Sequence, residues 1–178
     1  MDIPELLVAI LGVNPEGIDG RTAIQKLGYF CSVRLKEEVG YGPDFYGPYS
    51  PLVAAHIQDL VGMDFIGEKA RRTLHGRVMY SYYLTEDGEE LARGIHEANP
   101  EIYSAIKEVV ETCSNVVNNN IYVLSWAAKI HFIVSQTKKP ISYTEAIQLG
   151  QEFGWELNPS KIESAAKLLQ ALNLIKSH

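Results

Sequence analysis

Several features that would place this chain in a chemical class are rare or missing in its 178 residues. Cysteine occurs only at Cys31 and Cys113, in two separate helical patterns, so we expect two buried thiols, with a disulfide as the alternative. The apolar runs are shorter than the roughly 18 residues of a membrane helix. There is no low-complexity tract and no repeat of the about 20–50 residues typical of solenoids. We therefore expect a globular protein without a membrane span.

Catalytic motifs are missing as well. The five histidines are scattered, and no His-x-x-x-His or Cys-x-x-Cys pair suggests a zinc site. Neither Gly-x-Ser-x-Gly nor a phosphate-binding glycine loop is present. Adjacent acids at 37–38 and 89–90 point to different sides of a helix, as solvated residues do. We expect no catalytic residues and no metal. An enzyme stays a third hypothesis, which convergence of His131, Cys113 and acids in one pocket would favour.

Positive charge is scarce overall. The formal net charge is −6, from 16 basic and 22 acidic side chains. Residues 1–98 carry 9 Lys or Arg against 15 Asp or Glu, whereas residues 99–178 carry 7 of each. A protein of this sign needs a local basic patch to bind DNA. The first five residues contain acids where a signal peptide has bases, so we expect a cytoplasmic location.

Helical patterns dominate the first fifty residues. Residues 4–11 form a short apolar helix candidate, and residues 17–20 are expected to be a loop. From Arg21, apolar residues recur at spacings of three and four, which predicts a helix to about Glu38. Its buried face is expected to hold Ile24, Leu27, Cys31 and Leu35. Its polar face is expected to hold Arg21, Gln25, Ser32 and Lys36. Two Tyr-Gly-Pro units in residues 41–50 then exclude a helix or a regular strand.

A helix, a hairpin and a second helix follow. Ser50 is a predicted N-cap with Pro51 in the first turn, and the buried stripe is Val53, Ile57, Leu60 and Val61. Residues 65–73 and 77–84 are strand candidates joined by 74–76, and the second strand alternates. Thr85 caps the next helix, where acids suit the helix dipole. This order predicts the second half of a winged helix-turn-helix.

The second half of the chain is expected to be helical. Asn99-Pro100 breaks the chain, residues 101–116 form a helix, and Asn118–Asn120 is the best candidate for a boundary or hinge. Residues 122–135 are apolar nearly all round, as in a central helix. Ser142 and Glu145 form a predicted capping box, and Asn158-Pro159 begins the last helix, with Ile162, Ala165, Leu169 and Leu172 inside. Residues 121–175 are either a second helix-turn-helix or a helical cap.

The hairpin carries the main candidate binding site. Residues 68–77 hold four bases and one acid, a local charge of +3 on an anionic protein. Cationic side chains at a hairpin tip suit the phosphate backbone or the minor groove, and Gly76 allows a tight turn. The alternative is a solvated edge whose charges prevent aggregation. The candidate DNA-binding residues of the hairpin are Lys69, Arg71, Arg72, His75 and Arg77.

Two helices are candidates for reading the major groove of DNA. A helix in that role needs polar or basic side chains on its outer face. The helix after Ser50 offers Ala54, Ala55, Gln58, Asp59 and Gly62, a small and faintly acidic face that suits protein packing better than phosphate. The last helix offers Lys161, Ser164 and Lys167 as further DNA-binding candidates, with an ordinary solvated face as the alternative.

The proline-rich loop at 41–50 holds a second candidate surface, which either binds a partner or seals the core. Its residues are Tyr41, Phe45, Tyr46 and Tyr49.

Two motifs carry a resemblance. Residues 25–30 (QKLGYF) and 45–52 (FYGPYSPL) resemble the signature of a loose group of winged-helix proteins. The group includes the YwgA-like proteins of bacteria and archaea and, more distantly, the SocA-like (Panacea) domains of antitoxins and phage-associated proteins. Residues 82–92 (YYLTEDGEELA) are similar to the strand-to-helix junction of winged-helix transcription regulators. The resemblance covers about residues 20–98 and implies a winged-helix domain, no cofactor, and a regulatory or partner-binding role.

The sequence therefore predicts a mainly helical α+β protein, with a winged helix-turn-helix domain at 1–98 and a helical domain at 99–178. The leading hypothesis is a non-enzymatic regulator of transcription that binds double-stranded DNA through the basic wing, as a homodimer. Residues 101–116 are the expected dimer element. The alternative is an antitoxin- or adaptor-like protein-interaction module that uses the aromatic loop and the alanine-rich helix face. The acidic N-terminal half and the poor recognition face argue against operator reading.

Overall fold

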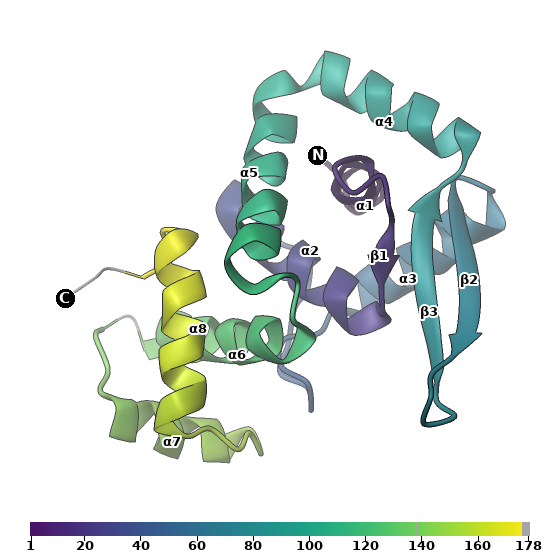
Figure 1. Cartoon of the computed structure of the whole chain (residues 1–178). Coiled ribbons are helices and arrows are strands. Elements are labelled where there is room, and N and C mark those ends of the chain that lie inside the picture. Colours follow the sequence, from purple (N-terminus) through teal and green to yellow (C-terminus); the bar gives the residue numbers. More distant parts are fainter. Residues whose placement is uncertain (138, 176–178) are drawn as a thin grey trace.

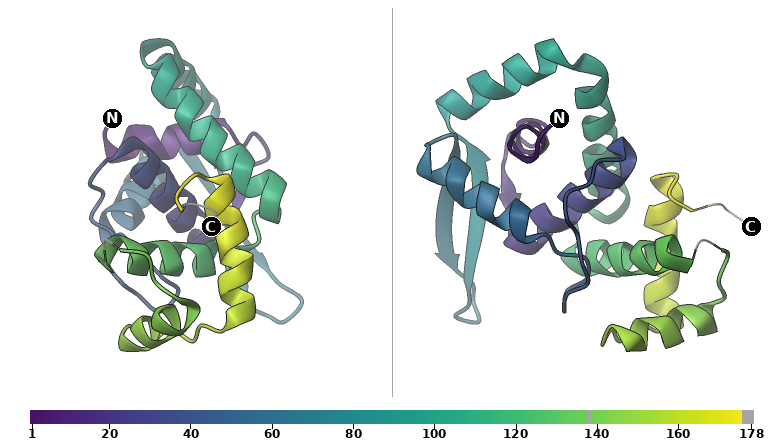
Figure 2. Two further views of the ribbon diagram at one scale, coloured as in Figure 1. Left: turned by 90° about the vertical axis from the view of Figure 1, so that its left-hand side faces the viewer. Right: turned by 180° about the vertical axis from the view of Figure 1, so that it is seen from behind.

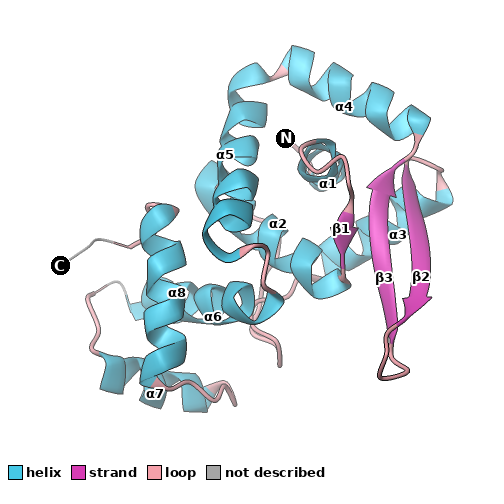
Figure 3. Cartoon of the chain, viewed as in Figure 1, coloured by secondary structure: helices cyan, strands magenta, loops and turns pink. Residues whose placement is uncertain are grey.

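The computed structural model describes residues 1–137 and 139–175, which are mainly helical with one small antiparallel sheet (Figures 1 and 3). This confirms the expected α+β class. None of the helices in these residues is long and apolar enough to cross a membrane. The elements are α1 (Ile3–Gly12), β1 (Ile18–Asp19), α2 (Arg21–Leu35), α3 (Pro51–Gly62), β2 (Ile66–Arg72), β3 (Val78–Leu84), α4 (Glu86–Ala98), α5 (Pro100–Val117), α6 (Ile121–Thr137), α7 (Tyr143–Glu152) and α8 (Pro159–Ala171).

Helix α1 lies at the centre of the N-terminal half. Asp2 and Glu5 each accept the other's backbone N–H, a capping box that begins the helix. Every residue of Leu6–Leu11 is buried, as in a helix covered on all sides. Figure 1 looks down this helix and shows α2, α3, α4, α5 and the sheet around it, and α1 contacts each of these elements. The first core of the protein is therefore built around α1.

The sheet has the strand order β1-β3-β2, and both pairings are antiparallel. The expected loop at 17–20 was wrong in part, because Ile18 and Asp19 form β1 opposite Tyr82 and Ser81. Two residues are too few for an alternating pattern, so this strand exists only through its partner β3. The two predicted hairpin strands are confirmed, each slightly shorter than expected.

Helix α2 departs from its expected amphipathic pattern. Half of its predicted polar face is inside: Gln25 and Ser32 are buried, whereas Arg21 and Lys36 are exposed. Lys26, which the prediction did not include, is 1% exposed. The helix ends at Leu35 and not near Glu38, because Lys36 adopts a left-handed conformation that closes it. Elements on several sides cover α2, among them α5 and α6. Polar residues on this helix must therefore find partners within the protein.

The predicted caps are confirmed. The Ser50 hydroxyl accepts the N–H of Val53 at 3.2 Å, and Thr85 accepts that of Gly88 at 3.1 Å. The capping box of Ser142 and Glu145 begins α7, and Asn158 caps α8. Local side-chain-to-backbone hydrogen bonds need only neighbouring residues, which is why these boundaries could be predicted closely.

The C-terminal helices form a second layer beside α2. Asn118 and Asn119 both have positive φ angles and turn the chain from α5 into α6. Helix α6 packs against α2 and against α8, as expected for a central helix, and the predicted inner face of α8 is buried. Seen from behind, the α2–α3 loop runs past α6 (Figure 2). Because α2 contacts both α5 and α6, the predicted segments 1–98 and 99–178 share an interface.

Candidate nucleic-acid interface

The β2–β3 hairpin projects from the N-terminal half with its tip pointing away from α4 (Figure 1). The tip is closed by hydrogen bonds from Thr73 N–H to the Arg77 carbonyl at 2.8 Å and from Gly76 N–H to the Thr73 carbonyl at 2.9 Å. Gly76 has φ +75°, a left-handed conformation that glycine adopts without steric cost. Lys69 and Arg72 occupy opposite faces of β2, because successive strand residues alternate sides.

Most of the hairpin's cations are free at the surface. Lys69, Arg72, His75 and Arg77 are all exposed. Among the ion pairs between described residues, none includes any of these four side chains. The tip therefore keeps a concentrated positive charge on an anionic protein, as the sequence predicted.

Arg71 differs from the other hairpin cations. Its guanidinium donates to the Asp19 carboxylate at 2.6 Å, and the other oxygen of that carboxylate accepts from the Ser81 hydroxyl. The sequence predicted a free charge at Arg71. The structure pairs it because the two-residue strand β1, which lacked a sequence signal, brings Asp19 beside the hairpin. Arg71 thus fixes the hairpin to β1 and adds less net charge than expected.

Arg21 anchors the base of the hairpin from the other side. Its Nε donates to the Tyr82 hydroxyl at 3.0 Å, and its guanidinium lies 4.1 Å from the centre of the Tyr80 ring. Glu68 is 3.8 Å from the same guanidinium. Arg21 was not among the predicted site residues, because these contacts join positions about sixty residues apart. The hairpin is therefore held on both faces, by Arg21 on one and by the Arg71–Asp19 pair on the other.

The outer face of α3 is neutral to acidic, as predicted. Gln58 and Asp59 are exposed, and Gln58 donates to the Glu68 carboxylate at 3.3 Å. His56 lies 3.6 Å from Asp59 on the same helix. A face that presents carboxylates beside the hairpin opposes the approach of phosphates to this helix. The tip, and not α3, is the basic part of this surface.

A cleft of about 1120 Å³ connects the hairpin to the C-terminal helices. It brings together two of the predicted DNA-binding residues, Arg77 from the hairpin tip and Lys161 from α8. The Lys161 Nζ donates to the Glu156 carbonyl at 2.7 Å, so this half-buried side chain is positioned by its own turn. Ser164, half-buried, and Lys167, exposed, do not belong to the lining.

The aromatic loop divides into inner and outer residues. Tyr41 was predicted either to bind a partner or to seal the core, and it lies inside: its hydroxyl donates to the Gln25 carbonyl at 2.9 Å and its ring packs edge-on against Tyr29. Burial raises the pKa of this hydroxyl well above its ordinary value. Phe45 and Tyr46 are 72% and 62% exposed and pack on each other. Only the tip of the loop, with the partly exposed Tyr49, is available to a ligand.

Two buried residues of α2 hold this loop in place. The Gln25 amide donates to the Ser50 carbonyl and accepts the Ser50 N–H, both at 3.0 Å. The Lys26 Nζ donates to the Pro48 carbonyl at 2.7 Å. Desolvation, with a smaller effect from Lys129, lowers the Lys26 pKa to about 8. The QKLGYF and YGPYS motifs are therefore two sides of one internal contact, which we call the loop clamp.

Neither His131 nor Cys113 lines the cleft. Cys113 is completely buried, and burial raises the pKa of its thiol to about 12, far from the range of a nucleophile. His131 pairs with the Tyr29 hydroxyl, 2.8 Å from its Nδ1. Within residues 1–137 and 139–175 there is no cluster of three or more His, Cys, Asp or Glu side chains that suits a metal ion. Cys31 is also buried, and neither cysteine forms a disulfide.

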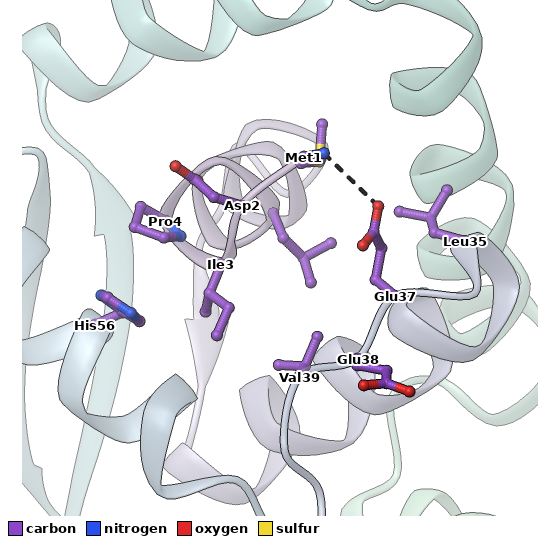
Figure 4. Close-up of a pocket in the computed structure, with 10 residues that line it drawn as sticks. Met1, Asp2, Ile3, Pro4, Leu35, Glu37, Glu38, Val39 and His56 are labelled. Atoms are coloured by element: carbon purple, nitrogen blue, oxygen red, sulfur yellow. Dashed lines mark ion pairs between the residues drawn. The ribbon is translucent and has the colours of Figure 1, made fainter.

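A smaller cavity of about 340 Å³ lies at the start of α1 (Figure 4). Its lining includes apolar residues of α1 and α2 together with Glu37, Glu38 and His56. The Met1 amino group lies 3.6 Å from a Glu37 carboxylate oxygen. The cavity is far from the hairpin tip in the fold and contains none of the predicted site residues.

The His131–Tyr29 pair makes stability depend on pH. Burial lowers the His131 pKa from 6.5 to about 4, so the folded protein holds this ring neutral where the unfolded chain binds a proton. The contribution is complete above pH 6.5 and is lost as the pH falls to about 4. Relative to His131→Gln, we expect the wild-type unfolding free energy to fall by about 2 kcal/mol over this window. Chemical denaturation at several pH values measures it.

The exposed His75 provides the control for this pH effect. His75→Gln is expected to keep the wild-type pH profile between pH 6.5 and 4. Carboxylates that titrate in this range are common to all three proteins and cancel in the differences. Parallel profiles for wild type and His131→Gln would contradict the assignment.

No protein-family model matches the chain, and no curated protein matches it either.

Proposed function

We propose that this protein is a non-enzymatic winged-helix regulator that binds double-stranded DNA mainly through the tip of its β2–β3 hairpin, the wing. The order α1, β1, α2, α3, β2, β3 supports the winged-helix assignment, with α2 and α3 as the helix pair. The observation that carries the proposal is the set of exposed, unpaired cations on Lys69, Arg72 and Arg77. Arginine and lysine at such a tip bind phosphates or enter a narrow minor groove.

The neutral to acidic face of α3 defines the mode of binding. Phosphate contacts position a protein on DNA, whereas contacts with base edges give sequence specificity. With Asp59 on the expected recognition helix and Glu68 beside it, the wing supplies most of the attraction and little base reading. We therefore propose binding with modest sequence preference and a strong dependence on salt.

The proposal is tested by removing the free wing charges together. For Lys69→Ala/Arg72→Ala/Arg77→Ala we expect duplex affinity to fall about tenfold to a hundredfold at 0.1 M salt, because each lost phosphate contact removes a released counterion. The slope of log K against log salt should flatten by about 2.7, at about 0.9 per contact. Fluorescence anisotropy of a labelled duplex across a salt series measures both quantities.

The matched control removes the same charge elsewhere. Arg34, Arg93 and Lys107 are exposed and lie outside the wing, so their triple alanine variant changes net charge equally. It should keep the wild-type salt slope. Equal losses in the two triple variants would show that binding follows net charge alone, and the wing model would then be wrong.

A protein-interaction role is the second candidate function. Phe45 and Tyr46 are exposed at the tip of a loop whose base is fixed by the loop clamp, and Leu52, 50% exposed, begins the alanine-rich α3. Rigid exposed aromatics are typical of binding surfaces because little entropy is lost when they are covered. Two results together would favour this role. The triple wing variant would bind duplex DNA with unchanged affinity, and Phe45→Ala would lose binding to a protein partner.

The predicted homodimer belongs to the proposal as well. The outer face of α5, its expected dimer element, is charged, with an exposed Lys107–Glu111 pair at 3.7 Å. Such a face suits solvent better than an apolar interface. Two wings on one duplex would still raise affinity by avidity. Light scattering with and without duplex gives the stoichiometry.

A further inference from the structure

The cleft between the wing and the C-terminal helices has features that the duplex-binding proposal does not use. Its walls come from the hairpin, the start of α2, the tip of the aromatic loop, and the beginnings of α6 and α8. Figure 1 shows the hairpin on one side of this region and α6, α7 and α8 on the other. Its volume of about 1120 Å³ slightly exceeds the about 300–1,000 Å³ of small-molecule pockets, and it is open to solvent. A double helix does not enter such a space, but a few nucleotides do.

Exposed aromatic rings belong to the lining of this cleft. Phe45 and Tyr46 lie on the loop tip, and Tyr122, 66% exposed, lies on α6. Tyr122 has Trp126 beside it, with ring centres 6.5 Å apart. Large exposed aromatic rings are costly in water unless a ligand covers them. Their flat faces suit other flat rings, including nucleobases.

Cations accompany these rings. Lys161 Nζ lies 5.8 Å from the centre of the Trp126 ring, and Arg21 lies over Tyr80. Lys129 and Arg77 complete the basic set of the lining. Desolvation lowers the pKa of Lys129, and repulsion from Lys161 lowers it further. The pKa of Lys26 is likewise lowered by desolvation first and by Lys129 second. This repulsion between neighbouring lysines supports a positive local potential.

The acids of the lining reduce this potential without cancelling it. They are Glu16, Asp19 and Glu156. The Asp19 carboxylate already binds Arg71 and Ser81, so its charge is neutralised locally. Arg21 is likewise shared with Glu68. Three cations, on Arg77, Lys129 and Lys161, then face two free acids.

We propose that this cleft binds a short segment of single-stranded nucleic acid, with bases stacked on Tyr46 and Tyr122 and phosphates near Lys129 and Lys161. Interleaved aromatic and basic side chains are the common feature of sequence-tolerant single-strand sites. The ligand differs from that of the duplex proposal, and of the cations that carry the two proposals only Arg77 is common to both. If a duplex bound at the wing opens, one of its strands becomes available beside the cleft.

The test uses the full chain and a labelled oligothymidylate of about 12 nucleotides, within the span of known single-strand sites. Tyr122→Ala and Tyr46→Ala are each expected to weaken binding about tenfold, because base stacking contributes about 1–3 kcal/mol for each base. Trp126 fluorescence should be quenched on binding, and Trp126→Phe should lose the quenching. Tyr143→Ala is the matched control, since Tyr143 is exposed on α7 outside the cleft.

The outcomes separate the two proposals. Retained duplex binding by Tyr122→Ala with weakened oligothymidylate binding supports a distinct single-strand site. Absent oligothymidylate binding, or equal affinity in Tyr122→Ala and Tyr143→Ala, would overturn it whatever the wing variants show. Thymidine monophosphate that competes as well as the oligonucleotide, at equal nucleotide concentration, would also overturn it, because the cleft would then be a mononucleotide site.

Discussion

Replacing Gln25 by leucine is expected to lower the free energy of unfolding by about 3 kcal/mol. The leucine keeps the volume of the side chain but removes both hydrogen bonds to the Ser50 backbone. Ser50 is completely buried, so its N–H would lose its partner without access to water, whereas its carbonyl still accepts the Ala54 N–H at 3.2 Å. An unsatisfied buried group costs about 1–3 kcal/mol, and the lost second bond to the carbonyl adds about 0.5–1.5 kcal/mol. Urea denaturation followed by circular dichroism measures the change.

Gln58→Leu is the control for this effect, since it is the same substitution on an exposed helix face. Its single side-chain hydrogen bond goes to Glu68, and the surface change should alter stability by no more than about 0.5 kcal/mol. If the two leucine variants were equally stable, the loop clamp would contribute nothing to the fold. The motif would then need a role in binding to explain its buried glutamine.

The clamp gives the motif residues a structural role that is separate from ligand contact. Gln25, Lys26 and Tyr41 fix the base of the loop, while Trp155 donates its Nε1–H to the Asp44 carbonyl at 2.7 Å and holds the tip region against the C-terminal helices. Between these two fixed points Phe45 and Tyr46 remain exposed. A loop held at both ends presents its aromatics with little entropy left to lose on binding.

Local features of the fold could be predicted from the sequence. Ser50, Thr85 and Ser142 begin their helices as their side chains indicate, because capping is decided within four residues. The two hairpin strands followed from the alternation in β3 and the glycine turn. The free charges of Lys69, Arg72 and Arg77 were also anticipated, since the tip of a projecting hairpin has few neighbours.

Contacts between distant residues could not be predicted in this way. The polar face of α2 looked solvated, yet Gln25 is buried because a loop twenty-five residues later covers it. Asp19 and Arg71 are fifty-two residues apart and meet only because β1 joins the sheet. A helical or alternating period reports which residues share a face, and it does not report what covers that face.

The same limitation applies to the cleft. Arg77 and Lys161 were predicted separately as DNA contacts on two surfaces, and the structure places both in one cavity lining. Tyr122 and Trp126 had been assigned to a central apolar helix, but the exposed end of α6 leaves Tyr122 largely outside the core. The candidate single-strand site thus depends on how the second half packs against α2.

The other large effect is expected for Gly88→Ala, which should destabilise the protein by about 3–4 kcal/mol. A Cβ atom at this position would lie 2.0 Å from the Phe65 carbonyl oxygen, a backbone atom that cannot rotate away. That carbonyl accepts the Thr85 N–H at 3.1 Å, where the hairpin returns to α4. Relief of the overlap must therefore shift the base of the wing as well as the start of the helix.

Gly94→Ala on the same helix should have the opposite sign. No atom lies within 4 Å of a Cβ built at Gly94, so alanine there gains up to about 1 kcal/mol from its higher helix propensity. Thermal denaturation of both variants compares them directly, with Gly88→Ala lowered and Gly94→Ala raised relative to wild type. Two shifts of the same sign would mean that helix propensity or a general glycine effect dominates, and that the junction between Phe65 and Gly88 is not tightly packed.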